Sequence, residues 1–142
     1  MSAQHMLPLI LVGLGNVGGT LLHQVLTTRE AVARRTGLTV VPVALADISG
    51  VVARPDGFPD ETLRAVLDSV RQRRLLVDAL PGDVRPLSEL ESLLRAGTVL
   101  VDVTAATGSS ELLHAALKAG GGVAIANKNP LTGAWQSTRD LF

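Results

Sequence analysis

Three glycines near the start of the chain have a spacing that is typical of phosphate-binding loops. Gly13, Gly15 and Gly18 form the pattern G-x-G-x-x-G within the stretch ILVGLGNVGGTLL. In such a loop the first glycine permits a tight turn, the second lets the backbone approach a pyrophosphate, and the third lets a helix pack closely on a strand. The N–H groups at the start of that helix favour a bound anion. The pattern therefore predicts a dinucleotide cradle, with a plain strand–helix turn as the alternative.

Two charged residues after the second apolar run favour opposite cofactors. Asp47 ends the stretch LTVVPVALAD, where a carboxylate accepts hydrogen bonds from an adenosine ribose and favours NAD. It lies farther from the last glycine than the usual ~20 residues, which a long first helix and its loop can absorb. Nearby Arg54 would instead pair with the 2′-phosphate of NADP. The sequence leaves this choice open, and Asp47 has the alternative reading of a solvated strand-end residue.

Small residues and a lysine follow two later apolar runs. Thr104 and Ala105 end the stretch TVLVDVTA, and Lys128 follows GVAIAN. Ligands of a doubly wound sheet bind at the carboxyl ends of its strands, so we expect these residues beside one crevice. Small side chains there would let a nicotinamide ribose pass close to the backbone. Most lysines are solvated surface charges, but the setting ANKNPLTG favours a functional role for Lys128.

Alternating strands and helices must position these residues. Strands are expected over 7–13, 38–47, 98–105 and 122–127. Helices are expected over 16–35, 60–74, 86–97 and 108–121, with a turn and a helix within 130–142. Residues 48–60 read as a loop, and 75–83 as a short strand or an extended connector. Asn16 is the expected N-cap of the first helix, and Pro42 predicts an edge, a bulge or irregular pairing.

This alternation predicts one domain of the α/β class. The near-continuous apolar strands indicate a doubly wound parallel sheet with helices on both faces, the Rossmann dinucleotide-binding fold. The length of 142 residues suits a single cofactor-binding domain.

The composition argues against several other functions. The chain has 13 basic and 13 acidic residues without a long run of one sign, which disfavours a nucleic-acid or membrane-surface role. It has no cysteine, which excludes disulfides and thiolate catalysis, and its three scattered histidines predict no metal site. No apolar run approaches the ~18–20 residues that span a bilayer, and no targeting segment is recognisable, so we expect a cytoplasmic protein.

The combined motifs resemble those of the homoserine dehydrogenases. The matching pieces are GLGNVGG, the strand end ALAD, VDVTA and above all ANKNPLTG, and together they cover essentially the whole chain. The resemblance implies that the pyrophosphate is held by Gly13, Gly15, Asn16, Val17 and Gly18. It also implies that Asp47 lies near the adenosine ribose, that Thr104 and Ala105 lie against the nicotinamide, and that Lys128 faces nicotinamide and substrate. Asn129 stands where the family usually has a second lysine.

The resemblance also implies a reaction. Homoserine dehydrogenases use NADP or NAD for hydride transfer between aspartate semialdehyde and homoserine, on the route to threonine, methionine and isoleucine. Their second domain binds the substrate and supplies an acidic residue and a lysine. We therefore expect this chain to be the cofactor-binding domain, inactive alone, of a parent enzyme that forms a homo-oligomer.

Two other functions fit part of the sequence. Another two-domain amino-acid dehydrogenase would have the same architecture. A nucleotide-sensing regulatory domain, which is not an enzyme, carries the same glycine loop at about this size. A regulatory domain of this kind does not explain why Lys128 stands within ANKNPLTG.

Overall fold

The computed structural model describes residues 4–142, which fold around one five-stranded sheet with the strand order β3-β2-β1-β4-β5. The strands are β1 (His5–Val12), β2 (Leu38–Asp47), β3 (Gly50–Ala53), β4 (Val99–Asp102) and β5 (Gly122–Ile125). All neighbouring strands are parallel except β3, which runs antiparallel to β2 at the edge. The predicted α/β fold is confirmed, with an added antiparallel edge strand.

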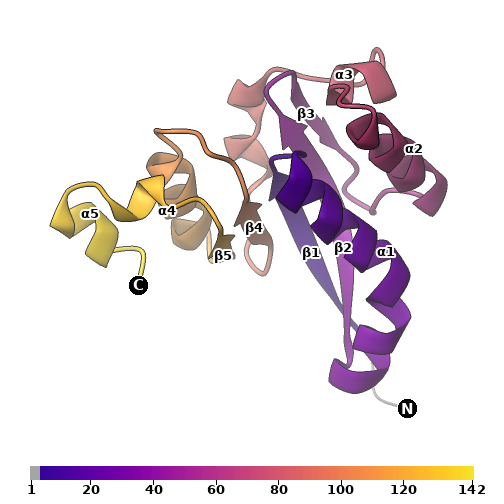
Figure 1. The fold of residues 1–142 in the computed structure, drawn as a ribbon. Coiled ribbons are helices and arrows are strands. Elements are labelled where there is room, and N and C mark those ends of the chain that lie inside the picture. The colour runs from indigo at the N-terminus through magenta and orange to yellow at the C-terminus, as the bar shows by residue number, and fades with distance from the viewer. Residues whose placement is uncertain (1–3) are drawn as a thin grey trace.

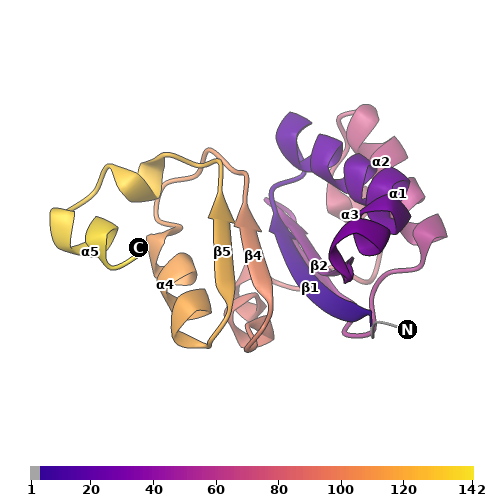
Figure 2. The same ribbon diagram turned by 90° about the horizontal axis from the view of Figure 1, so that it is seen from below.

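Helices cover both faces of this sheet. They are α1 (Asn16–Thr36), α2 (Asp60–Arg71), α3 (Leu76–Ala79), α4 (Ser110–Lys118) and α5 (Trp135–Arg139), with short 3₁₀ turns at η1 (Leu87–Glu89), η2 (Glu91–Leu93) and η3 (Asn129–Leu131). Figures 1 and 2 show α1, α2 and α3 together beside β1 and β2, and α4 and α5 at the β5 end. None of the helices within residues 4–142 has both the length and the apolar character needed to cross a membrane.

Alternate residues of the strands face two separate apolar clusters. Leu11 packs with Leu22 of α1 and Leu63 of α2 on one face, whereas Ile10 packs with Leu113 of α4 on the other. Side chains alternate along a strand, so Leu9, Ile10 and Leu11 of β1 are all apolar because both faces of the sheet are buried there. The two layers hold the carboxyl ends of the parallel strands at one edge.

Pro42 interrupts the pairing of β1 with β2, as predicted. Leu9 pairs with Pro42 and Ile10 pairs with Ala44, so Val43 is skipped and the register shifts. Proline has no N–H to donate to the strand ladder, which explains a bulge at this position.

Three segments differ from their predicted structure. The expected loop over 48–60 contains β3, whose four residues are too few to show a strand period. The expected strand or connector over 75–83 contains the one-turn helix α3. The expected helix over 86–97 is instead the two 3₁₀ turns η1 and η2, in which the Leu90 N–H bonds to the Leu87 carbonyl at 3.0 Å. Leucines spaced three apart suit a 3₁₀ turn as well as an α-helix.

The start of α1 was also predicted wrongly by one residue. Asn16 is the first helical residue, and Gly15 occupies the N-cap position without any side-chain hydrogen bond. The Asn16 backbone carbonyl instead accepts a hydrogen bond from the Thr20 hydroxyl at 2.7 Å. The first turn of α1 therefore begins on a bare glycine.

Candidate functional site

The carboxyl ends of β1, β2 and β4 border one groove of about 1020 Å³. Its lining includes most of the predicted site residues, namely Gly13, Gly15, Asn16, Asp47, Thr104 and Ala105. Val17, Gly18 and Lys128 are not in the lining. Leu75, Leu87 and Leu90 give the groove an apolar wall, as a flat aromatic base would require.

Each glycine of the loop has a different environment. Gly13 has a φ of +105°, which L side chains rarely adopt, and its N–H donates to the Ala46 carbonyl at 2.8 Å. A Cβ on Gly18 would collide with the Gly13 carbonyl oxygen, so the close packing of α1 on this turn requires glycine. A Cβ on Gly15 would meet no atom within 4 Å. Glycine is an acceptable N-cap for α1, and the absence of a side chain at Gly15 also leaves the groove accessible.

The start of α1 is suited to an anion. The first N–H groups of an α-helix have no partner within the helix and carry a partial positive charge. The first turn of α1 contains no acidic residue, and no side chain caps it. Because Gly15 is open on the same turn, the residues present fit a pyrophosphate.

Asp47 has a structural role in addition to its place in the groove. One of its carboxylate oxygens accepts hydrogen bonds from the Ser49 N–H, at 2.8 Å, and from the Ser49 hydroxyl. The other accepts the Leu76 N–H at 2.7 Å. The carboxylate therefore links the end of β2 to α3, and a fourth lone-pair site stays available for a ligand hydroxyl.

Arg54 does not reach the groove. Its guanidinium pairs with Asp83 at 2.8 Å, donates to the Ala53 carbonyl at 3.0 Å and lies 5.8 Å from the centre of the Phe58 ring. The structure therefore gives no support to Arg54 as a ligand of a 2′-phosphate. The arginines in the groove lining are Arg73 and Arg74.

Lys128 follows β5 at the same edge of the sheet, with an exposed side chain. Its backbone is well held, since its carbonyl accepts the Leu131 N–H at 3.0 Å. The next residue is fixed as well, because the Asn129 N–H donates to the Asn127 side-chain oxygen at 3.1 Å. A backbone held by these hydrogen bonds, with an ammonium group that forms no ion pair within residues 4–142, suits contact with a ligand outside the groove wall.

Sequence reasoning missed a buried polar network between β4 and β5. Asp102 is 1% exposed and Asn127 is 3% exposed, and the Asn127 amide donates to the Asp102 carboxylate at 3.1 Å. The other Asp102 oxygen accepts the Thr104 N–H at 3.0 Å and the Thr104 hydroxyl at 2.7 Å. The Asn127 amide also donates to the Ala106 carbonyl at 2.9 Å. The network fixes the segment that carries Thr104 and Ala105. A sequence signal exists, because Asp102 ends an apolar strand and Asn127 ends the apolar run GVAIAN.

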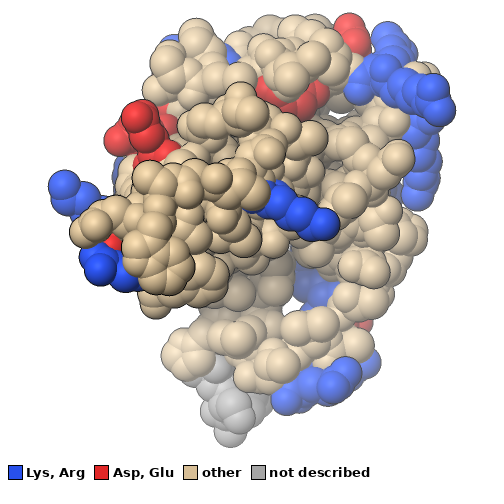
Figure 3. Space-filling model, turned by 60° about the vertical axis from the view of Figure 1, so that its left-hand side comes forward, with Lys and Arg blue, Asp and Glu red and all other residues tan. Residues whose placement is uncertain are grey.

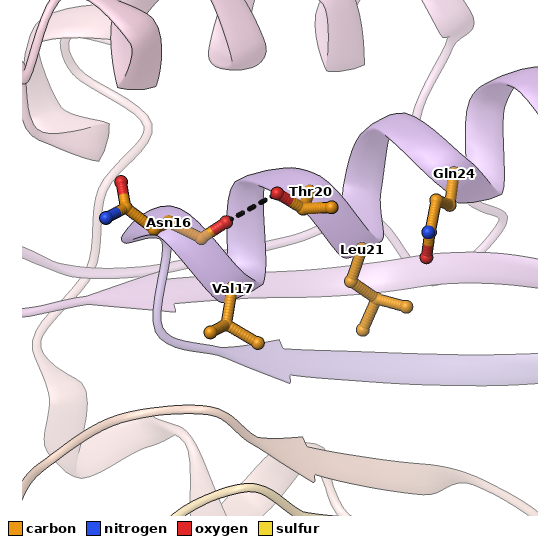
Figure 4. Close-up of a pocket in the computed structure, with 5 residues that line it drawn as sticks. All are labelled: Asn16, Val17, Thr20, Leu21 and Gln24. Carbon is orange, nitrogen blue, oxygen red and sulfur yellow. Dashed lines mark hydrogen bonds between the residues drawn. The ribbon is translucent and has the colours of Figure 1, made fainter.

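A second, smaller hollow of about 410 Å³ lies along the exposed face of α1 (Figure 4). It is lined by Asn16, Val17, Thr20, Leu21 and Gln24. All five belong to one helix, and no charged group lines the hollow. Side chains from several elements therefore do not converge on it, as they do in a catalytic site.

Comparisons with known proteins agree with this geometry. A family model described as "Homoserine dehydrogenase, NAD binding domain" matches residues 13–142. A hyperthermophilic archaeal homoserine dehydrogenase mutant, solved in complex with NADPH, is 22% identical with a TM-score of 0.72, and the match covers 96% of this chain and 40% of that one. Homoserine dehydrogenase from Thermoplasma acidophilum is 22% identical with a TM-score of 0.66 and the same coverage. The putative homoserine dehydrogenase from Archaeoglobus fulgidus is 21% identical with a TM-score of 0.67, covering 96% and 39%.

This chain thus spans about 40% of the length of the solved relatives that it matches. At these identities the structural likeness shows a shared fold. None of the curated proteins compared with the chain matches it.

Proposed function

This chain belongs to the family of homoserine dehydrogenase NAD-binding domains, and we propose that it binds NADP or NAD in the groove at the carboxyl edge of its sheet. One observation carries the proposal. Gly18 and Gly13 are required by packing, whereas Gly15 faces open space beside an uncapped helix start. The N-cap position alone would accept Ser, Thr, Asp or Asn as well as glycine, so the lack of any side chain at Gly15 favours a pyrophosphate close to the backbone.

The proposed contacts follow from this position. Gly13, Gly15, Asn16, Val17 and Gly18 would hold the pyrophosphate. Asp47 would accept a hydrogen bond from the adenosine ribose through its remaining lone-pair site. Thr104 and Ala105, which the buried network holds in place, would lie against the nicotinamide half.

A nicotinamide bound there would supply or accept the hydride in the proposed reaction. Lys128 is the catalytic residue that we propose from this chain, because its ammonium group would place a positive charge beside the substrate oxygen. Asn129 gives no second charge, and its amide instead donates to the Ala105 carbonyl at 3.0 Å. It therefore supports the nicotinamide segment.

The substrate pair belongs to the same proposal. We propose aspartate semialdehyde and homoserine as the aldehyde and alcohol, within threonine, methionine and isoleucine biosynthesis in the cytoplasm. We also propose that substrate binding, proton delivery and homo-oligomer formation depend on a second domain, as the resemblance to homoserine dehydrogenases implies.

Calorimetric titration of the purified chain with NADH and with NADPH tests the cofactor proposal. We expect saturable binding of at least one cofactor at one site per chain. Trp135 is 75% exposed on α5 and lies outside the groove lining, so energy transfer from its indole is a supporting readout only. No heat with either cofactor at millimolar concentration would contradict the proposal.

An activity assay on the same preparation tests whether turnover requires a second domain. With homoserine and oxidised cofactor, we expect binding without turnover by the chain of 142 residues. Measurable formation of reduced cofactor would show that these residues contain the complete catalytic machinery.

A further inference from the structure

The end of α2 has an unusual backbone conformation. Arg73 has a φ of +57°, and it is the one non-glycine residue with a positive φ in the part of the chain that the structure describes. Its N–H donates to the Val70 carbonyl at 2.9 Å, and the Arg74 N–H donates to the Ser69 carbonyl at 2.9 Å. These two bonds form the Schellman motif, in which the left-handed position is usually glycine.

The same chain places glycine where its other long helices end. Gly37 follows α1 with a φ of +74°, and Gly120 lies just after α4 with a φ of +88°. An arginine in this conformation is strained, since its Cβ crowds the backbone. Such an outlier, when it lies in a binding groove, indicates a functional constraint on the side chain.

Arg73 and Arg74 lie beside the end of β2. Both line the groove together with Asp47 and Ile48, and the hydrogen bond from the Leu76 N–H to Asp47 holds this segment there. Figure 3 shows Lys and Arg side chains gathered along the upper right edge of the molecule, on the side of α2 and α3. The segment therefore brings positive charge to the place where an adenosine ribose is expected.

Neither guanidinium is paired within residues 4–142. The arginines that form ion pairs there are Arg29, Arg54, Arg71, Arg85 and Arg139. The two carboxylates of the groove, Asp47 and Glu91, form no ion pair with Arg73 or Arg74. Both oxygens of the Asp47 carboxylate already accept hydrogen bonds from Ser49 and Leu76.

We infer that Arg73 and Arg74 bind the 2′-phosphate of the adenosine ribose, so that the chain prefers NADP to NAD. The inference rests on the proposed cofactor function. Two adjacent planar guanidinium groups match the geometry and the charge of a phosphate dianion. This assignment replaces Arg54, which its ion pair with Asp83 keeps away from the groove.

The double variant Arg73→Ala/Arg74→Ala tests the inference by calorimetry with NADPH and NADH. We expect the unmodified chain to bind NADPH about 10-fold or more tightly than NADH, since charge-assisted hydrogen bonds to the phosphate are strong. The double variant should lose this preference and keep its NADH affinity. The matched control Arg54→Ala should leave both affinities unchanged.

A second variant, Arg73→Gly, separates binding from folding. Glycine suits the left-handed position, so we expect the Tm to rise by about 2–4 °C while the NADPH affinity falls. A purely structural role would not lower the affinity of a more stable protein. Equal affinities of the unmodified chain for the two cofactors would overturn the inference and leave the cofactor function standing. Absence of binding by either cofactor would overturn both.

Discussion

Gly15→Ala is expected to weaken cofactor binding by about 10- to 100-fold without unfolding the protein. The backbone at Gly15 is extended, with a φ of −79°, and a Cβ there would meet no protein atom within 4 Å. The alanine gains stability by reducing the freedom of the unfolded chain and loses a similar amount as a poorer N-cap. We therefore expect the free energy of unfolding to change by less than about 1 kcal/mol. A bound pyrophosphate, however, would meet the new methyl group.

Gly18→Ala is the matched comparison, since it adds the same methyl group three residues away. Its Cβ would collide with the Gly13 carbonyl oxygen, so α1 must shift on the strand–helix turn. We expect the free energy of unfolding to fall by about 1–3 kcal/mol, together with a loss of binding. Urea unfolding and calorimetry on both variants give the two quantities. Gly15→Ala with unchanged affinity would show that GLGNVGG is only a turn.

The contrast between these glycines explains why the loop could be predicted from sequence. The requirement for glycine at 13 and 18 comes from local geometry, which the spacing G-x-G-x-x-G encodes directly. The strands β1, β2 and β4 were equally predictable, because they are mostly apolar runs between helical periods. The glycine spacing and the apolar strands together predicted the edge of the sheet at which the candidate site lies.

Features that depend on distant partners could not be predicted. Nothing in the sequence marks Arg73 and Arg74, and only the fold, in which the Leu76 N–H bonds to Asp47, brings them to the groove. Arg54 lies closer to Asp47 in the sequence, but its ion pair with Asp83 holds it elsewhere. Nearness along the chain was therefore a poor guide to which arginine could reach the ribose.

The link between Asp102 and Asn127 is the clearest example of such a distant partnership. Strand pairing brings the end of β4 beside the end of β5, and the Asn127 amide then supplies a donor to a carboxylate that is 1% exposed. A buried carboxylate without its donor costs more than an ordinary lost hydrogen bond. The network must therefore stabilise the domain as well as position Thr104.

Asn127→Leu, which keeps the approximate size of the side chain, is expected to lower the free energy of unfolding by about 3 kcal/mol. This corresponds to a fall in Tm of about 6–12 °C for a domain of this size. Cofactor affinity should fall too, since the variant releases the Ala106 carbonyl and the segment that carries Thr104. Thermal and urea unfolding measure the first effect, and calorimetry measures the second.

Two further variants show whether the buried carboxylate of Asp102 causes the loss of stability in Asn127→Leu. Asn129→Leu removes an exposed amide from the same turn, and we expect it to cost less than about 1 kcal/mol because water can replace its bonds. Asp102→Asn removes the charge that Asn127 satisfies. In combination with Asn127→Leu it should therefore destabilise the protein by clearly less than the sum of the two single effects. Additive effects would instead mean that Asn127 stabilises the fold through Ala106 and Ser109 alone, and that the carboxylate of Asp102 does not depend on it.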